Sequence, residues 1–594
     1  MLTAACGSTS GAPVTTSTGW SASTTSIATT ATAANTTITA TTAVVPDPVD
    51  LILTGGPIVT MDPDLGTAEA IAIDGDRIVA VGSATEIARY QGPTTTVIDL
   101  DGRAVQPGFV DPHTHILTDM GGIEHGQTLA LANGITSLAD ASIEPGVPDD
   151  FLDASFSGLL RIRASLYLVR GDVCGEDLGT WYEEYPQDSV VGERARIGGV
   201  KIFSDGGACG AIAASETILE GYENGPLYHD LETLTEMIRR ADAAGYQVIV
   251  HAQGDIAIAE VQDAYAVVLD GRPNVMHHRI DHNVLQTDAT ITRYGELGLV
   301  PVLFGSSEAC RADLPWTDFY KENGERPGDI IAANPGLIVS WHGDDPWQTP
   351  INPIYELFSL VTRGRVTDDG TVCQPAEWMK GAEVGRGQAL EMMTIDAAYA
   401  IRQEDVVGSL APGKYADLLV LTENLLTVPA ESIPGVKLLA TIIGGVTEFC
   451  LPGAESWCPG VEPQAPQGAS ASASRVGHGP ELVLDGRASG ESFWSSGADA
   501  PQWIKIDLPE PAAVTEVRFT VYQNPPGDTV HELELLVDGD WIPGETFRGF
   551  TTTGDILTWR PAEPTENVAA LRITTTASPS WPEWFEIEVD TTDG

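Results

Sequence analysis

Basic residues are scarce in this sequence. Its 594 residues include 31 lysines and arginines against 84 aspartates and glutamates, which gives a formal net charge of −53. A protein that binds nucleic acid or an anionic membrane surface needs a basic face, so this balance argues against both partners. Long apolar runs are also missing, and no internal stretch predicts a membrane-spanning helix. The composition predicts a soluble, exported protein.

The first residues lack the basic region and the apolar stretch that open a secretory signal. They read MLTAACGSTS, in which small residues lead to Cys6 and a Ser/Thr/Gly run follows, as at the end of a bacterial lipoprotein signal. We expect the true start to lie upstream and Cys6 to carry a lipid that anchors the protein at the cell surface. The alternative is a cytoplasmic protein with an unusual tail. Residues 8–45 are almost wholly Thr, Ala and Ser, so residues 1–45 are predicted to be a signal remnant and a disordered tether.

Cysteine is rare, with seven in the whole chain. Without Cys6, six remain, an even number that fits disulfides outside the cell. Cys450 and Cys458 bracket a short loop that a bridge would close. The pairing of the other four is left open by the sequence.

Apolar runs of strand length alternate with segments of helical periodicity across residues 109–400. Eight runs read as buried strands: FVDPHTH, ITSLAD, IRASLYLV, VKIFSDG, YQVIVHA, VMHHRIDH, LVPVLFG and LIVSWHGDD. Segments such as LETLTEMIRRADAAG and DIAIAEVQDAYAVVL lie between them. Eight strands with intervening helices predict an α/β fold, a (β/α)8 TIM barrel. Alternating runs within residues 46–108, bounded by Gly and Asp-Gly turns, predict a small β unit before it.

Residues able to bind a metal collect at the C-terminal ends of these predicted strands. They are His113 and His115 on the first strand, Lys201 and Asp205 on the fourth, His251 on the fifth, His282 on the sixth and Asp344 on the eighth. The His-x-His spacing turns two imidazoles to the same side of a strand. Because the C-terminal strand ends of a barrel converge on one mouth, we expect these side chains to meet and to form a metal site.

Several stretches of the chain resemble the amidohydrolase superfamily. They are PGFVDPHTH, VKIFSDG, VIVHAQGD, HHRIDH, the GDDP around Asp344, and TIDAAYAIRQEDVVGSLAPGKYADLLVL. The resemblance covers about residues 50–450, and its motifs are most similar to those of the amidohydrolase 3 branch, which includes formamide deformylase-like enzymes. It implies that residues 46–108 and 401–458 together form a β sandwich beside the barrel. The stretch between His115 and Lys201 is shorter than is usual in that branch, so the resemblance does not extend to the substrate.

The resemblance implies a centre of one or two divalent ions, with zinc as the expected metal. His113, His115 and Asp344 would bind the more buried ion, and His251 and His282 the second. Lys201 would bridge the ions as a carboxylated lysine, because an ammonium group cannot act as a ligand whereas a carbamate offers two oxygens. The alternative for Lys201 is an ion pair with a nearby aspartate.

The same resemblance implies a hydrolase of non-peptide C–N bonds in an amide, carbamate or cyclic amide. Water held by the metal would be deprotonated near neutral pH and attack the carbonyl. Asp344 would accept the proton of that water and pass it to the departing nitrogen.

Four further residues are candidates for substrate binding or for orienting the ligands: Asp205, Tyr222, Arg279 and His342. For Asp205 and Arg279 the alternative is pairing with neighbours, and for His342 a satisfied histidine within a strand. At least one of His277 and His278 is expected to pack behind the site. Trp341 and Trp347 fit the core as well as substrate stacking.

The C-terminal part is organised differently. Residues 459–474 have a linker composition, and residues 475–594 contain runs with period two, which predict an antiparallel, jelly-roll-like sandwich. The run LVLDGRASGESFWSS followed by PQWIKIDLPEPAAVTEVRF resembles discoidin-like (factor 5/8 C-type) modules, which often bind glycans or lipid head groups. Trp494, Trp581 and Trp584 are the candidate contacts for such a ligand, and Trp503 is expected in the core.

Two other functions remain open at this point. A mononuclear deaminase of the same superfamily would need Glu at position 254, where this chain has Gly254, and Lys201 also argues against it. A surface glycan-binding protein with an inactive barrel is the other rival. The complete set of predicted ligands argues against an inactive barrel.

Overall fold

The computed structural model describes residues 46–591 apart from residues 121, 192–193, 349, 452, 461–469, 476–478, 485–492 and 563. The predicted signal remnant and tether, with Cys6, and most of the predicted linker therefore lie outside the described residues. Within the described part of the chain, no helix combines the length and the apolar character needed to cross a membrane.

Eight parallel strands form a nearly closed barrel in the order β14-β13-β12-β11-β10-β8-β7-β6. They are β6 (Phe109–Thr114), β7 (Ile135–Ile143), β8 (Arg163–Gly171), β10 (Ala195–Phe203), β11 (Val248–Ala252), β12 (Arg279–His282), β13 (Val300–Phe304) and β14 (Ser340–His342). The indole N–H of Trp341 donates to the carbonyl of Val110 at 2.8 Å and so links the last strand to the first. All eight predicted strands are confirmed, and Trp341 belongs to the core.

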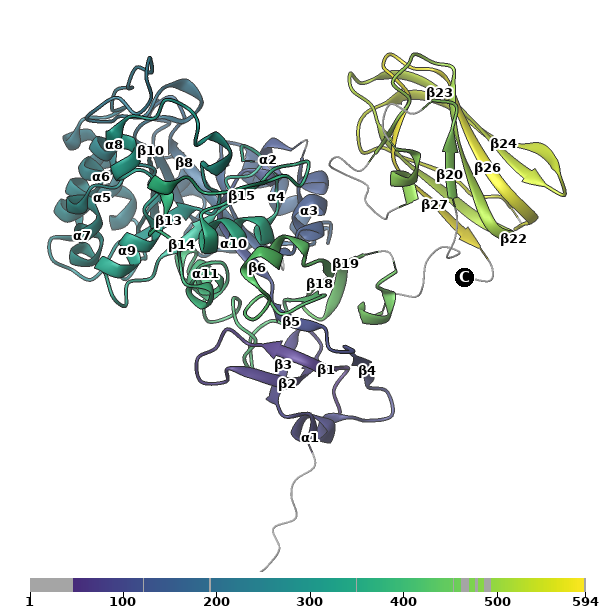
Figure 1. Cartoon of the computed structure of the whole chain (residues 1–594), viewed down its shortest axis with the longest axis horizontal. Helices are drawn as coiled ribbons and strands as arrows, with labels where there is room; N and C mark the ends of the chain where they lie inside the picture. Colours follow the sequence, from purple (N-terminus) through teal and green to yellow (C-terminus); the bar gives the residue numbers. More distant parts are fainter. Residues whose placement is uncertain are drawn as a thin grey trace, which may run out of the picture. The chain divides into compact units, whose positions relative to one another are not determined.

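Helices connect the strands, and α5, α6 and α7 lie next to one another on the outside of the barrel (Figure 1). The helices are α2 (Ile116–Asp119), α3 (Ile123–Ala132), α4 (Val147–Phe156), α5 (Leu231–Ala243), α6 (Asp255–Leu269), α7 (Asp288–Leu297), α8 (Asp318–Asn323), α9 (Pro327–Ala333), α10 (Pro353–Thr362), α11 (Arg386–Met392) and α12 (Ile395–Ala400). In α5, Asp230 caps the N-terminus through the Thr233 N–H. The two helical segments read from the sequence are α5 and α6.

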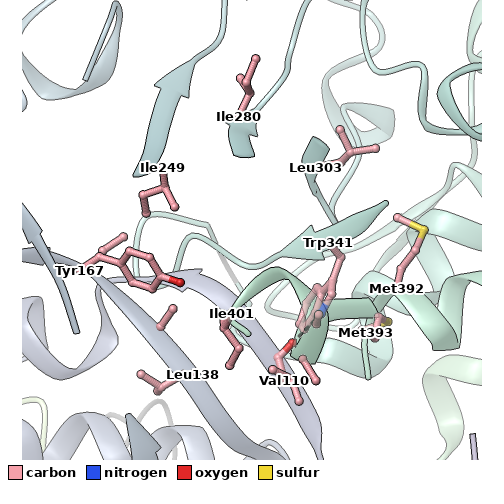
Figure 2. Close-up of a cluster of buried hydrophobic side chains, with 14 of the residues drawn as sticks. Val110, Leu138, Tyr167, Ile249, Ile280, Leu303, Trp341, Met392, Met393 and Ile401 are labelled. Carbon is pink, nitrogen blue, oxygen red and sulfur yellow. Dashed lines mark hydrogen bonds between the residues drawn. The ribbon is translucent and has the colours of Figure 1, made fainter. Parts of the chain in front are cut away.

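The core of the barrel is a cluster of buried apolar side chains from its strands. Figure 2 shows Tyr167, Ile249, Ile280, Leu303 and Trp341 converging, together with the side chains of Met392, Met393 and Ile401 from the last helical segments. This packing holds the strands in the arrangement that brings their C-terminal ends together.

The segments on either side of the barrel build one eight-stranded sheet. It contains β1 (Leu51–Val59), β2 (Thr67–Asp74), β3 (Arg77–Gly82), β4 (Thr96–Asp99), β5 (Ala104–Pro107), β17 (Leu418–Leu421), β18 (Leu438–Ile443) and β19 (Val446–Cys450). The two segments join where β5 pairs antiparallel with β17, with Val105 opposite Val420. The short helix α1 (Ala84–Ile87) follows β3. Arg163 at the start of β8 binds Asp417 at 2.6 Å and so ties this sheet to the barrel.

The C-terminal module is all β, as predicted. Its antiparallel strands are β20 (Ser470–Ala473), β21 (Trp494–Ser495), β22 (Gln502–Tyr522), β23 (Gly527–Val537), β24 (Asp540–Thr551), β25 (Ile556–Trp559), β26 (Thr565–Ala577) and β27 (Glu583–Thr591). The structure corrects the roles of its tryptophans. Trp494 and Trp584 are fully buried in the module's core and cannot contact a ligand, whereas Trp503, expected in the core, is only half-buried. Trp581 is 50% exposed and remains available.

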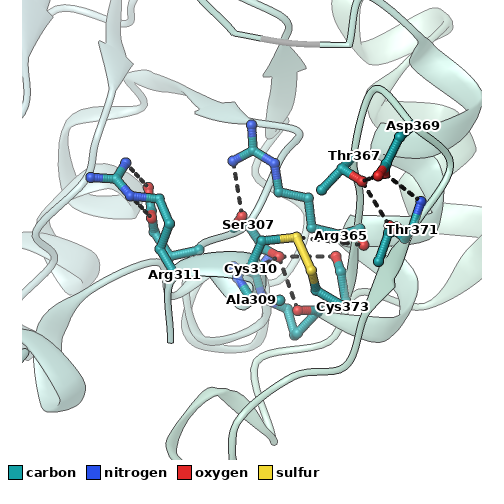
Figure 3. Close-up of a disulfide and its surroundings, with 12 residues drawn as sticks. Ser307, Ala309, Cys310, Arg311, Arg365, Thr367, Asp369, Thr371 and Cys373 are labelled. Atoms are coloured by element: carbon teal, nitrogen blue, oxygen red, sulfur yellow. Dashed lines mark hydrogen bonds and ion pairs between the residues drawn. A yellow bond between two sulfur atoms is a disulfide. The ribbon is translucent and has the colours of Figure 1, made fainter. Parts of the chain in front are cut away.

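Six cysteines form three disulfides: Cys174–Cys209, Cys310–Cys373 and Cys450–Cys458. The bridge predicted for Cys450 and Cys458 is confirmed. Figure 3 shows the second bridge, which joins the turn at Cys310 to the hairpin of β15 (Arg365–Val366) and β16 (Val372–Cys373).

Candidate metal centre

The structure brings the predicted metal ligands together at the C-terminal mouth of the barrel. The imidazole of His113 on β6 lies 4.5 Å, between ring centroids, from that of His282 at the end of β12. The ring of His282 lies 4.2 Å from that of His251 on β11. His115 follows β6 directly, with its ring 5.3 Å from that of His113. Four imidazoles from three strands therefore share one small volume.

Asp344 lies at the centre of this group. One of its carboxylate oxygens is 3.6 Å from His113 Nε2 and 3.5 Å from His115 Nε2, and the other is 3.8 Å from His282 Nδ1. Burial alone raises the pKa of Asp344, but the His115 hydrogen bond and the nearby positive groups outweigh it and hold the pKa below its ordinary value. The lowered pKa favours the ionised form of Asp344 among these imidazoles.

The loop that carries Asp344 is locked onto the first strand by backbone bonds. The Asp344 N–H donates to the His113 carbonyl at 3.1 Å, and the His115 N–H donates to the Asp345 carbonyl at 2.7 Å. Asp344 has φ +58°, a left-handed conformation that costs free energy in a non-glycine residue. The surrounding bonds hold its carboxylate in place despite that cost.

Asp281 sets the orientation of His113. Its Oδ2 lies 2.6 Å from His113 Nδ1, so Nε2 is the nitrogen that faces the mouth. Arg279 in turn binds Asp281 at 3.1 Å and donates to the carbonyls of Pro112 and Ala400. Arg279 is fully buried and does not line the cavity at the mouth; it pairs with its neighbours, one of the alternatives considered for it, and supports the carboxylate that orients a predicted ligand.

Lys201 is fully buried on β10. Its Nζ lies 3.3 Å from His113 Nε2 and 4.4 Å from the centre of the Phe203 ring, and in the described part of the chain no ion pair with an aspartate accompanies these contacts. Burial lowers the pKa of Lys201 to about 8. The neutral amine is therefore more accessible here than in an ordinary lysine, and the ion pair considered as an alternative is not formed among the described residues.

The donor set fits a divalent cation. Among the residues that the structure describes, seven buried ring nitrogens of His115, His251, His282 and His342 have no hydrogen-bond partner. Such atoms each cost free energy unless a partner satisfies them. The pKa values of His113, His251 and His282 all lie well below the usual value for histidine. Burial is the largest cause, and nearby positive charge adds to it. Neutral imidazoles are the form that binds metals.

His342 lies in a strand, but within the part of the chain that the structure describes its ring nitrogens do not have the hydrogen-bond partners that the alternative interpretation expected. Its ring lies 4.8 Å from that of His282, and both of its nitrogens lack a partner among the described residues. It therefore belongs to the site, although it does not line the cavity in front of it. His278, by contrast, binds Asp242 and the Val248 N–H, and His277 stacks on Tyr399, so both pack behind the site.

Three buried carboxyl groups behind Asp344 were not singled out from the sequence. Asp111 accepts the N–H groups of His113 and Gly343, and burial raises its pKa to about 7. Burial raises the pKa of Asp345 and of Glu356 well above the usual range, and repulsion from neighbouring carboxylates adds to it. The signal for two of them was present, since Asp111 lies within DPHTH and Asp345 within GDDP.

A cavity of about 340 Å³ opens beside His282. Its walls combine aromatic and apolar side chains, including Tyr222, Phe304, Trp316 and Tyr320, with about as many polar or charged ones, and Tyr222 lies where the sequence predicted a pocket residue. Asp205 does not line this cavity. Its oxygens accept the N–H groups of Ala213, Gln253 and Gly254 at 2.8–2.9 Å, so it pairs with its neighbours, the alternative considered for it, and holds the loops after β10 and β11 together.

Clustered histidines, one buried lysine and one aspartate at the mouth of a (β/α)8 barrel are the features of a metal-dependent hydrolase. Comparison with known protein families identifies the family of this chain. Residues 121–449 match the amidohydrolase family, and the chain belongs to that family. Residues 468–587 match the F5/8 type C domain.

Individual relatives are distant. The chain is 24% identical over 541 residues to Protein LONG AFTER FAR-RED 3 of Arabidopsis thaliana, covering 67% of this chain and 91% of that protein. It is 25% identical over 431 residues to an imidazolonepropionase of Symbiobacterium thermophilum, covering 63% of this chain and 91% of that protein. An uncharacterized metal-dependent hydrolase from Pyrococcus furiosus has the same fold, with a TM-score of 0.52 and 19% identity over 64% of this chain and all of the other. These likenesses agree with the barrel fold and do not identify a substrate.

Proposed function

We propose that this protein hydrolyses a non-peptide C–N bond of a small molecule, an amide, carbamate or cyclic amide, with a divalent metal centre. The observation that carries the proposal is the position of Asp344, whose oxygens lie within 3.8 Å of nitrogens on His113, His115 and His282. The relatives named imidazolonepropionase and adenine deaminase support the C–N class, since those names describe C–N chemistry.

His113, His115, Lys201, His251, His282 and Asp344 would hold the metal, with zinc proposed as the ion and Lys201 proposed to be carboxylated. The bound metal supplies a Lewis acid and lowers the pKa of water. A carbamate forms from a neutral amine, and the lowered pKa of Lys201 favours that form. One or two ions are compatible with this set of residues.

Asp344 performs the proton transfer in this proposal. Its carboxylate is ionised and faces the mouth, so it can accept a proton from the attacking water and return it to the departing nitrogen. The buried bonds of its backbone keep the carboxylate in one position during both transfers.

The deaminase alternative is disfavoured by packing as well as by sequence. A Cβ atom at Gly254 would lie 1.9 Å from the carbonyl oxygen of Ala213. The glutamate that a deaminase of this superfamily would need at this position therefore has no room without movement of the loop after β10.

Metal analysis tests the proposal. Wild type and Lys201→Ala, both purified with added bicarbonate, are compared by elemental mass spectrometry, with Lys414→Ala as the control. Lys414 is also partly buried, but its ammonium binds the carbonyls of Glu404 and Val407 away from the mouth. We expect about two zinc equivalents in wild type and control, and fewer in Lys201→Ala. One equivalent that Lys201→Ala leaves unchanged would contradict the bridging role, and none in any variant would favour the binding-protein alternative.

Turnover is tested on amides, carbamates and cyclic ureas. Replacing Asp344 by Asn removes the proton acceptor, and we expect turnover to fall by about 10²- to 10⁴-fold while circular dichroism shows a folded protein. Full activity of Asp344→Asn would contradict the assignment.

Export and surface anchoring are part of the proposal. Three disulfides among six cysteines fit an oxidising compartment, and Cys6 is proposed to carry the lipid. The F5/8 type C domain is proposed to bind a glycan or another surface ligand, with the exposed Trp581 as one contact. A glycan array with wild type and Trp581→Ala tests this role, and labelling with a lipid precursor tests the anchor.

A further inference from the structure

Arg363 stands out at the wall of the cavity beside His282. It follows α10 in the left-handed conformation, with φ +59°, and only 2% of it is exposed. Its Nη2 donates to Glu325 Oε2 at 2.6 Å. Among the residues that the structure describes, its Nε and Nη1 have no partner. A buried guanidinium with unsatisfied N–H groups is costly unless something else binds it.

Each arginine that lines this cavity has a carboxylate partner, but Arg311 and Arg326 are more exposed than Arg363. Arg311 binds Glu308 at 3.3 Å, and Arg326 binds Asp329 at 2.6 Å. Arg363 shares the single carboxylate of Glu325, and the Glu308 N–H also donates to that carboxylate. Arg363 is therefore the one cavity-lining arginine, within the described residues, that is buried with free donors.

The position of Arg363 is fixed by the segment that carries it. The hydroxyl of Ser307 donates to the carbonyls of Arg363 and Gly364, each at 2.9 Å. Two residues further on, Arg365 begins the hairpin that the Cys310–Cys373 disulfide joins back to the turn after Ser307 (Figure 3). This bracing holds the backbone of Arg363 at the cavity wall.

His282 and Arg363 line the same cavity, whose wall has an apolar and aromatic part, with Phe304 and Trp316, as well as polar and charged side chains. A volume of about 340 Å³ suits a small ligand. Glu325, Arg326 and Arg363 also line a second cavity of about 160 Å³, so they stand between the two spaces. A molecule with its reacting group at the histidines can extend along the apolar part of the wall and end against Arg363.

We propose that Arg363 binds a carboxylate on the substrate, so that this site takes an apolar or aromatic molecule with an acidic group remote from the C–N bond. A carboxylate matches a guanidinium because both its oxygens accept charge-assisted hydrogen bonds. The apolar wall between the two polar ends binds the body of the molecule. This inference rests on the proposed function for the reaction at the metal site, but the binding of the carboxylate does not depend on turnover.

The test measures binding of 4-phenylbutyrate and of its neutral amide, 4-phenylbutyramide, by isothermal titration calorimetry. Wild type, Arg363→Gln, Arg363→Lys and Glu325→Gln are compared, each with and without metal. The surface variant Arg239→Gln is the control, because Arg239 forms only an exposed pair with Glu236. Circular dichroism establishes that each variant is folded.

We expect wild type and control to bind the carboxylate about 10- to 100-fold more tightly than the amide, with or without metal. Arg363→Gln removes this preference and Arg363→Lys keeps part of it. Glu325→Gln increases the affinity for the carboxylate, because the competing acceptor loses its charge. A purely structural role for the pair would weaken binding of both probes in both variants.

A preference that survives in Arg363→Gln and vanishes on metal removal would mean that the carboxylate binds the metal, and it would overturn the inference. If Arg363→Gln does not fold, Glu325→Gln decides, since unchanged or weaker carboxylate binding in that variant contradicts the inference. Carboxylate binding that depends on Arg363 without turnover of any C–N substrate would defeat the proposed function alone. Turnover of neutral amides with no effect of Arg363 would defeat this inference alone.

Discussion

Asp281 determines which nitrogen of His113 is available at the mouth. Its carboxylate holds His113 Nδ1 at 2.6 Å, and Nε2 is then left to face Lys201 at 3.3 Å. Burial raises the pKa of Asp281, and the ion pair with Arg279 at 3.1 Å offsets part of that rise and holds the carboxyl group in place. The sequence places Asp281 next to a predicted ligand, but only the fold shows that it reaches across to the first strand.

Replacing Asp281 by Asn tests this role at the level of one residue. The amide keeps the shape but removes the charge that orients His113, and we expect zinc affinity to fall about 10- to 100-fold. Zinc retained against a graded series of chelator concentrations is the measurement. Asp242→Asn is the matched control, because Asp242 binds His278 at 3.1 Å behind the barrel and should leave zinc affinity unchanged. Equal loss in both variants would mean that the effect comes from general destabilisation.

At the scale of whole elements, strands were predictable and the walls of the cavity were not. Each barrel strand carries an apolar run that has to be buried, and its last polar residue must then emerge at the common mouth. His251 and His282 could therefore be placed from the sequence. Arg363 and Glu325 could not, because each lies in a connection whose path depends on tertiary contacts such as those of Ser307. The contacts of Asp205 could not be predicted for a related reason, since its three backbone partners come from two different loops.

The disulfides make a prediction at this scale. Cys310 and Cys373 are 63 residues apart in sequence, whereas Cys450 and Cys458 are 8 apart. The chain-entropy model gives about 4 kcal/mol for closing the longer loop and about 2.5 kcal/mol for the shorter one. We expect Cys310→Ser/Cys373→Ser to lower the unfolding temperature more than Cys450→Ser/Cys458→Ser.

Hydrogen exchange should locate the effect of the first pair. Residues 306–311 and 363–373 are expected to exchange faster without the bridge, while β1 stays protected. Equal loss of stability in the two double variants would show that native contacts, and not loop closure, determine what each bridge contributes.

Two buried groups, one in each folded part, should contribute to stability with opposite dependence on pH. In the barrel, burial raises the pKa of Asp396 to about 7, so the folded state binds a proton more readily than the unfolded chain and its stability increases as pH falls. In the C-terminal module, burial lowers the pKa of His531 to about 4, so the unfolded chain binds the proton more readily and stability decreases as pH falls below the unfolded value.

Calorimetry of the full chain at pH 7.5 and pH 5.5 measures both effects. Between these values we expect Asp396 to add about 1–2 kcal/mol to the barrel and His531 to remove about 1 kcal/mol from the module. Asp396→Asn should remove the first contribution and His531→Gln the second, each measured as the difference from wild type at the two pH values. A module transition in His531→Gln that still falls with acid as in wild type would contradict the role of His531.

The sheet shared by the two flanking segments has a consequence for biosynthesis. β5 ends at Pro107, and its partner β17 begins at Leu418, about 310 residues later. At ordinary elongation rates the ribosome needs about 15–60 s to make the intervening chain. During that time one edge of β5 has no neighbour to pair with, and an unpaired edge strand invites association with other chains. The nascent protein therefore passes through a long interval in which β5 has an open edge, and synthesis of β17 after the barrel is what ends that exposure.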